Sequence, residues 1–194
     1  DFLPSRRHAL FLALLVVFWM RPILFPINEL WVNHNRFNDY MRAWGVVHAW
    51  GAGVWDARWI PTFDYGYGYP IFRYYMPLVH WINGLFTAVT RSALLALQLS
   101  VFLWMCVGAV GTYAAAQALW SRVLDRDLRG WQPGLLAAIG WILATYPSTN
   151  IFVRGTLSEY AASTMLSWIC FFAILALGRN ASPSLRDVPA YAGA

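Results

Sequence analysis

The chain has 194 residues, of which 59% are hydrophobic, 18% aromatic and 12% charged, with a formal net charge of +5. A water-soluble domain carries about 25% charged residues, so this chain is too apolar to cover a water-facing surface and is predicted to be an all-α integral membrane protein. The net positive charge comes with no lysine-rich run and no nucleic-acid motif, which argues against nucleic acid as a partner and leaves membrane lipids.

The first predicted spanning helix covers residues 8–27, because a membrane crossing needs about 20 mostly apolar residues. The basic and apolar start of the chain resembles a signal peptide but lacks a small-residue cleavage site, so we expect an uncleaved helix. We also expect a fragment of a longer protein, because the chain starts at Asp1 and residues 179–194 form a polar tail.

Residues 28–92 form a long loop that contains one ambiguous apolar segment, residues 71–89. This segment has the length of a spanning helix, but it contains Arg73, Pro77, His80 and Asn83. An arginine at the centre of a spanning helix costs about 2.5–3.5 kcal/mol, and the many rings suit the membrane interface better.

Three further apolar segments, residues 93–120, 134–152 and 160–178, are predicted to span the membrane. Cytoplasmic loops carry an excess of arginine and lysine. Arg6 and Arg7, the loop around Arg122 and Arg129, and Arg179 all fall on the cytoplasmic face only if residues 71–89 lie along the interface. We therefore favour four spanning helices and one interfacial helix, with residues 28–92 and 153–159 outside.

Two polar clusters would then share the external face. In "NHNRFNDYMRAW", Asp39 and Arg42 are three residues apart and would pair on one face of a helix. In "FVRGTLSEY", Arg154 and Glu159 stand at the start of an apolar helix, whose N-terminus would attract an anion. From the residues alone, the simpler explanation is a solvated loop with a surface ion pair for the first cluster and a structural Arg–Glu pair at a helix turn for the second. No spacing of cysteine or histidine indicates a zinc site.

The stretches "GVWDARWIPTFDYGYGYPIFRYYMPL" and "FVRGTLSEYAAS" resemble motifs of bacterial polytopic membrane proteins of the GT-C glycosyltransferase type. That type includes a group labelled 6-pyruvoyl-tetrahydropterin synthase-related membrane proteins. The likeness covers nearly the whole chain and is to the N-terminal part of those proteins, so it implies a truncated GT-C-like fold in the bacterial plasma membrane.

The resemblance implies an inverting transfer of a sugar from a polyprenyl-phosphate donor to an acceptor on the external face of the cell envelope. Divalent metal assists some members of the family. For such a reaction we expect Asp39 to act as the base or as a metal-site carboxylate and Glu159 as a second catalytic carboxylate. We expect His34 to be a polar orienting group, Arg42 and Arg154 to be phosphate or carboxylate partners, and Arg73, Asp64 and Tyr67 to lie at the floor or rim of the site.

The chain departs from the family in its first motif, where Asn35 follows His34 in the place of the usual aspartate. Three hypotheses follow: Asp39 substitutes from one helical turn further on, Glu29 substitutes, or the protein is catalytically impaired. The last favours a non-catalytic protein of lipid-linked glycan handling or assembly. A secondary transporter would need more spanning helices and inverted repeats.

Overall fold

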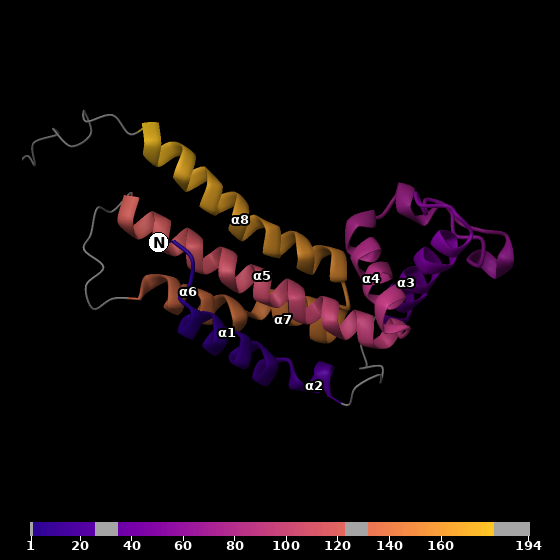
Figure 1. The fold of residues 1–194 in the computed structure, drawn as a ribbon, viewed down its shortest axis with the longest axis horizontal. Coiled ribbons are helices and arrows are strands. Elements are labelled where there is room, and N and C mark those ends of the chain that lie inside the picture. The colour runs from indigo at the N-terminus through magenta and orange to yellow at the C-terminus, as the bar shows by residue number, and fades with distance from the viewer. Residues whose placement is uncertain (1, 26–34, 123–131, 181–194) are drawn as a thin grey trace, which may run out of the picture.

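The computed structural model describes residues 2–25, 35–122 and 132–180 as an elongated helical bundle (Figure 1). Within these ranges the only strand-like pairing is a single bridge between Ile60 and Tyr69. The helices are α1 (Arg6–Trp19), α2 (Arg21–Leu24), α3 (Arg36–Gly51), α4 (Pro77–Thr90), α5 (Ala93–Arg122), α6 (Pro133–Ile142), α7 (Thr145–Thr149) and α8 (Leu157–Asn180), with 3-10 turns η1 (Asp64–Gly66) and η2 (Ile71–Arg73) and a π-helical turn η3 (Asn150–Arg154).

Three helical segments are long and apolar enough to cross a membrane, namely Ala93–Arg122, Pro133–Arg154 and Leu157–Leu177. They correspond to the spans predicted at residues 93–120, 134–152 and 160–178. The second is not one straight α-helix, because α6 ends at Ile142 and α7 begins at Thr145, two residues before Pro147. The prediction of an all-α protein with several apolar helices of membrane-spanning length is confirmed.

The span predicted at residues 8–27 is divided at Met20. The α1 helix has 14 residues and α2 has four, so neither alone has the length of a crossing. Pro22 causes this break, because its ring lacks an N–H donor and clashes with the preceding turn. Residues 26 and 27 lie outside the described residues, and a fourth spanning helix stays a prediction.

The helix predicted over residues 71–89 begins later than expected. Residues 71–73 form η2, and the α-helix starts only at Pro77, after Met76 in an extended conformation with ψ 115°. A proline disfavours the helical region for the residue before it and suits the first position of a helix. With 14 residues α4 rises about 21 Å, which is too short to cross a 30 Å core.

The long helices alternate in direction along the bundle. Arg122, at the end of α5, lies over the ring of Phe2, whereas Gln98, near the start of α5, donates to the carbonyl of Ile23, so α1 and α5 are antiparallel. The hydroxyl of Thr164, in the first half of α8, donates to the carbonyl of Trp104, in the first half of α5, because α8 runs parallel to α5.

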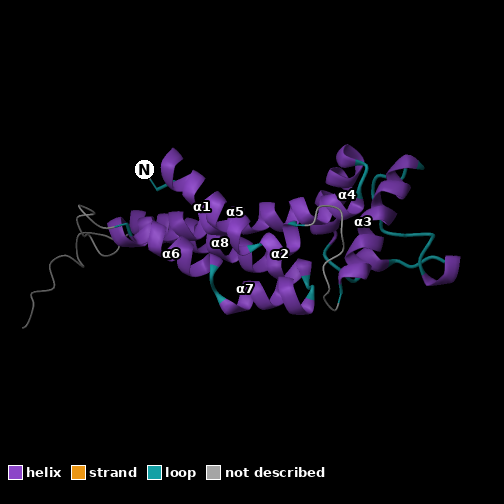
Figure 2. Ribbon diagram, turned by 90° about the horizontal axis from the view of Figure 1, so that it is seen from below, coloured by secondary structure: helices purple, strands orange, loops and turns teal. Residues whose placement is uncertain are grey.

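This alternation separates the two ends of the bundle. Arg6, Arg7 and Arg122 lie at one end, and α3, α4 and the start of α8 gather at the other (Figures 1 and 2). The separation agrees with the predicted topology, in which the basic segments and the long loop face opposite sides of the membrane. The interfacial placement of α4 remains a prediction.

Topology can be checked with single cysteines in a background in which Cys106 and Cys170 are replaced by alanine. We expect a membrane-impermeant maleimide to label Ala52→Cys, at the exposed end of α3, in intact spheroplasts. Asp125→Cys, in the basic loop outside the described residues, is expected to react only after the membrane is disrupted. Ready labelling of Asp125→Cys in intact spheroplasts would refute the orientation.

Small residues let the long helices approach one another, as is usual in membrane bundles. A Cβ added to Gly108 of α5 would lie 2.2 Å from the ring of Trp141 on α6. Gly108→Ala should therefore destabilise the bundle by about 1–3 kcal/mol through overpacking. Gly140→Ala is the matched control, because a Cβ there meets nothing within 4 Å, and it should be neutral or slightly stabilising. Thermal unfolding in detergent measures both; equal midpoints would contradict the close packing of α5 against Trp141.

Candidate functional site

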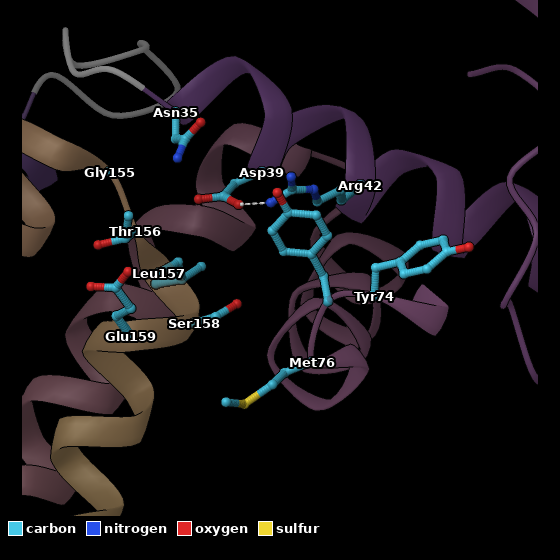
Figure 3. A pocket seen from close by; sticks show the side chains of 11 residues that line it. Asn35, Asp39, Arg42, Tyr74, Met76, Gly155, Thr156, Leu157, Ser158 and Glu159 are labelled. Atoms are coloured by element: carbon cyan, nitrogen blue, oxygen red, sulfur yellow. Dashed lines mark hydrogen bonds and ion pairs between the residues drawn. The ribbon is translucent and has the colours of Figure 1, made fainter. Parts of the chain in front are cut away.

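A pocket of about 230 Å³ opens at the end of the bundle that carries α3 and α4 (Figure 3). Three segments that are distant in the chain form its walls: the start of α3, the residues just before α4, and the turn into α8. The lining residues are Asn35, Asp39, Arg42, Tyr74, Tyr75, Met76, Gly155, Thr156, Leu157, Ser158 and Glu159.

The first wall is built around a buried ion pair on α3. The Nη1 group of Arg42 donates to Oδ1 of Asp39 at 3.1 Å, and the two side chains are only 10% and 9% exposed. Their i,i+3 spacing places them one helical turn apart on the same face, as predicted. The guanidinium of Arg42 also lies 4.4 Å from the centre of the Tyr75 ring, a cation–π contact.

Burial controls the protonation of Asp39. Removal from water raises the pKa of the Asp39 carboxyl to about 7, while the charge and hydrogen bond of Arg42 act in the opposite direction. His80 of α4 lies behind it, with Nε2 4.0 Å from Asp39 Oδ1. Burial, helped by Arg42, lowers the pKa of His80 to about 3, so this imidazole is neutral at pH 7.

The second wall is the turn between η3 and α8. Gly155 adopts the left-handed conformation with φ 67°, which a residue without Cβ reaches at no steric cost. The turn brings Arg154 back onto Glu159 in a two-point interaction, with N–O distances of 2.8 and 3.2 Å. Beneath it the buried amide oxygen of Asn150 accepts from Arg154 and from the Thr156 hydroxyl.

The structure therefore brings together the two polar clusters found in the sequence. Asp39, Arg42 and Glu159 line the same pocket, and their side chains approach it from opposite walls (Figure 3). Arg154 stands beside it and, with Asn35, Val153 and Thr156, lines an adjoining hollow of about 400 Å³.

Other predicted residues are placed differently. Arg73, Asp64 and Tyr67 are not among the residues that line the pocket; Tyr74, Tyr75 and Met76 occupy that rim instead. Tyr67 is 84% exposed on the loop before α4. His34 and Glu29 lie outside the described residues. The roles assigned to all of these residues stay predictions.

The sequence motifs assign no role to His80, Tyr75 or Asn150. His80 carried a signal, since an ionisable residue inside an apolar helix usually serves a function, but it served only as evidence against a membrane crossing. Asn150 and Tyr75 carried none, because their contacts depend on how η3 and the segment before α4 pack.

The carboxylates of this pocket offer few free oxygen ligands to a divalent metal. Hard cations prefer several free oxygen ligands, but Asp39 is engaged by Arg42 and Glu159 by Arg154. Among the described residues no group of three or more histidine, cysteine, aspartate or glutamate side chains could hold a metal ion.

Comparison with known proteins found no matching family model, no matching curated protein and no matching solved structure. The functional interpretation of the pocket therefore depends on its geometry and on the motifs.

Asp39 and His80 should give opposite pH dependences of stability. The folded-state pKa of Asp39, about 7, exceeds the ordinary 3.8, so its contribution is present at low pH and is lost as pH rises from about 4 to 7. The folded-state pKa of His80, about 3, lies below the ordinary 6.5, so its contribution is lost as pH falls from about 6.5 to 3.

In the native protein these two effects largely cancel between about pH 4 and 6.5. Asp39→Asn removes the first, so we expect the unfolding temperature in detergent to rise with pH across this window, more steeply than in the unsubstituted protein. Asp56→Asn, in the exposed pair with Arg58, is the control and should keep the original profile. An unchanged slope in Asp39→Asn would contradict the buried environment of the carboxylate.

Proposed function

We propose that this chain forms the carboxylate and phosphate site of a bacterial membrane glycosyltransferase, which transfers a sugar from a polyprenyl-phosphate donor to an acceptor hydroxyl on the external face of the plasma membrane. The main support is that Asp39–Arg42 and Gly155–Glu159, distant in sequence, line one pocket. Gly155–Glu159 and the rim residues Tyr74, Tyr75 and Met76 also belong to the two stretches that carry the resemblance to GT-C proteins, whereas Asp39 and Arg42 belong to the motif in which the chain departs from it.

Asp39 has the properties that a general base needs. A carboxylate is most effective as a base when its pKa lies near the working pH, and burial raises the pKa of Asp39 to about 7. Its Oδ1 is held by Arg42, and its other oxygen points across the pocket towards the start of α8 (Figure 3). That second oxygen is the one available to an acceptor hydroxyl.

In the proposed reaction the α3 wall supplies the base and the turn into α8 supplies the groups that bind phosphate. Asp39 accepts the proton of the acceptor hydroxyl as its oxygen attacks the anomeric carbon of the sugar. The bond from that carbon to the donor phosphate breaks on the opposite side, so the configuration inverts and polyprenyl phosphate leaves with the electron pair. In this proposal Arg154 and the backbone N–H groups at the start of α8 stabilise this phosphate.

A non-catalytic role in lipid-linked glycan handling is the second candidate, and Asn35 favours it. The Asn35 amide lines the pocket at the position where the resemblance expects an aspartate. The α3 wall therefore lacks one acidic group of the family pattern. In this case Asp39 and Glu159 would serve binding or folding only.

The two candidates differ in how the acidic residues affect product formation. In cells that lack the native protein and produce the full-length protein or a variant, Asp39→Asn should lower formation of the glycosylated product at least about 100-fold, since a general base contributes about 10²–10⁴-fold. Glu159→Gln should also lower it, because the pocket loses the second carboxylate that the resemblance assigns to the site.

Asp56→Asn is the matched control, because this exposed aspartate pairs with Arg58 and is not among the residues that line the pocket. It should leave product formation unchanged. If Asp39→Asn and Glu159→Gln also leave product unchanged while the proteins reach normal levels in the membrane, the transferase proposal is wrong and the non-catalytic candidate stands.

A further inference from the structure

His80 is a buried polar side chain that the mechanism above does not use. It has no exposed surface, and neither ring nitrogen has a hydrogen-bond partner. Its ring packs against Phe72, with centroids 5.5 Å apart. A buried polar group without a partner costs about 1–3 kcal/mol, so an apolar residue of similar size would be the more stable choice if packing were the only requirement.

The carboxylate of Asp39 is an acceptor close to this ring, with its Oδ1 4.0 Å from Nε2. A neutral imidazole has one N–H donor and one acceptor nitrogen, and the position of its proton is fixed by the groups around it. The guanidinium of Arg42, on the same carboxylate, disfavours a second positive charge. A neutral ring with the proton on Nε2 would meet the carboxylate after a shift of about 1 Å, given ordinary hydrogen-bond lengths.

Such a contact would complete the restraint on Asp39. Arg42 already binds Oδ1 from the same helix, and His80 would bind it from α4. Held by donors from two helices, Oδ1 cannot rotate into the pocket, and the other oxygen stays directed towards α8 (Figure 3).

We propose that His80 is the positioning residue of Asp39: its neutral, Nε2-protonated ring donates to Oδ1, so that a single carboxylate oxygen is presented to the pocket. The catalytic consequence rests on the proposed function, whereas the hydrogen bond and the tautomer do not. The same contact stabilises the ionised carboxylate and therefore opposes the rise in the pKa of Asp39 that burial causes.

The charged or titratable groups that face Asp39 come from each element packed around it. Arg42 lies on α3 itself, Tyr75 covers Arg42 from the segment before α4, His80 lies on α4, and Glu159 faces it across the pocket from α8. The start of α5, residues 93–105, has no ionisable side chain.

Nuclear magnetic resonance of the full-length protein in lipid nanodiscs tests this without any substrate. With 15N-labelled histidine, the signal lost in His80→Gln identifies His80; it should show a neutral ring protonated at Nε2 from pH 5 to 8. With 13C-labelled aspartate, the signal lost in Asp39→Asn identifies Asp39 and gives its titration midpoint.

We expect His80→Leu to raise the titration midpoint of Asp39 by about one pH unit, because the carboxylate loses a donor. His80→Gln should restore most of the original midpoint, since its amide supplies an N–H at a similar reach. Thr87→Val is the control for a polar deletion elsewhere on α4, where Thr87 is buried and donates to the Asn83 carbonyl; it should leave the midpoint unchanged.

A cationic ring, a ring protonated at Nδ1, or an Asp39 midpoint that is the same in His80→Leu as in the unsubstituted protein would each overturn the proposal. Transfer activity is measured in a separate experiment. If transfer is observed, His80→Leu should lower kcat more than it changes KM and shift the acidic limb of the pH profile upward. If no transfer is found with any variant, the proposed function fails while the resonance results still decide the role of His80.

Discussion

The buried pair between Asp39 and Arg42 is the interaction on which the rest of the site depends. Each ion loses several kcal/mol of hydration when it is buried, and only their mutual attraction and further hydrogen bonds offset that loss. Both side chains are about nine-tenths covered. The pair stays buried only while the segment before α4 and the start of α8 pack against α3. The raised pKa of Asp39 is therefore a consequence of how three segments dock, and it would vanish if α3 were detached.

The location of the pocket follows from what a membrane permits. Within a hydrocarbon layer backbone groups must be satisfied inside the chain, which favours uninterrupted helices such as α5 and α8. Irregular backbone lies near the pocket in η2, in η3 and in the left-handed turn at Gly155, and it also occurs between α6 and α7 within the second apolar segment. A π-helical turn often marks a functional site, and η3 ends at Arg154. The same irregularity that would be costly in lipid gives the pocket its donors.

The sequence predicts those parts of the structure that depend on local composition. The limits of α5 and α8 come within three residues of the predicted ones, because a long apolar run has few alternatives to a helix. The predicted helix limits differ from the observed ones at Met20 and before Pro77, where a proline interrupts the helix. The pairing of Asp39 with Arg42 was predictable from their spacing, but the burial that gives Asp39 its chemistry depends on Tyr75 and His80, which reach it only through tertiary packing.

The two arginine–carboxylate pairs of the pocket have the same chemistry but different surroundings, and this difference separates their roles. Arg154 and Glu159 are 49% and 45% exposed, and an exposed pair is worth only about 0–1 kcal/mol, so Arg154 can exchange its carboxylate for a phosphate at little cost. Arg42 is 10% exposed, and removing its partner would leave a buried charge at a cost of about 3–5 kcal/mol. Under the proposed function, Arg154 is the arginine that a lipid phosphate can recruit, whereas Arg42 must stay with Asp39 throughout the reaction.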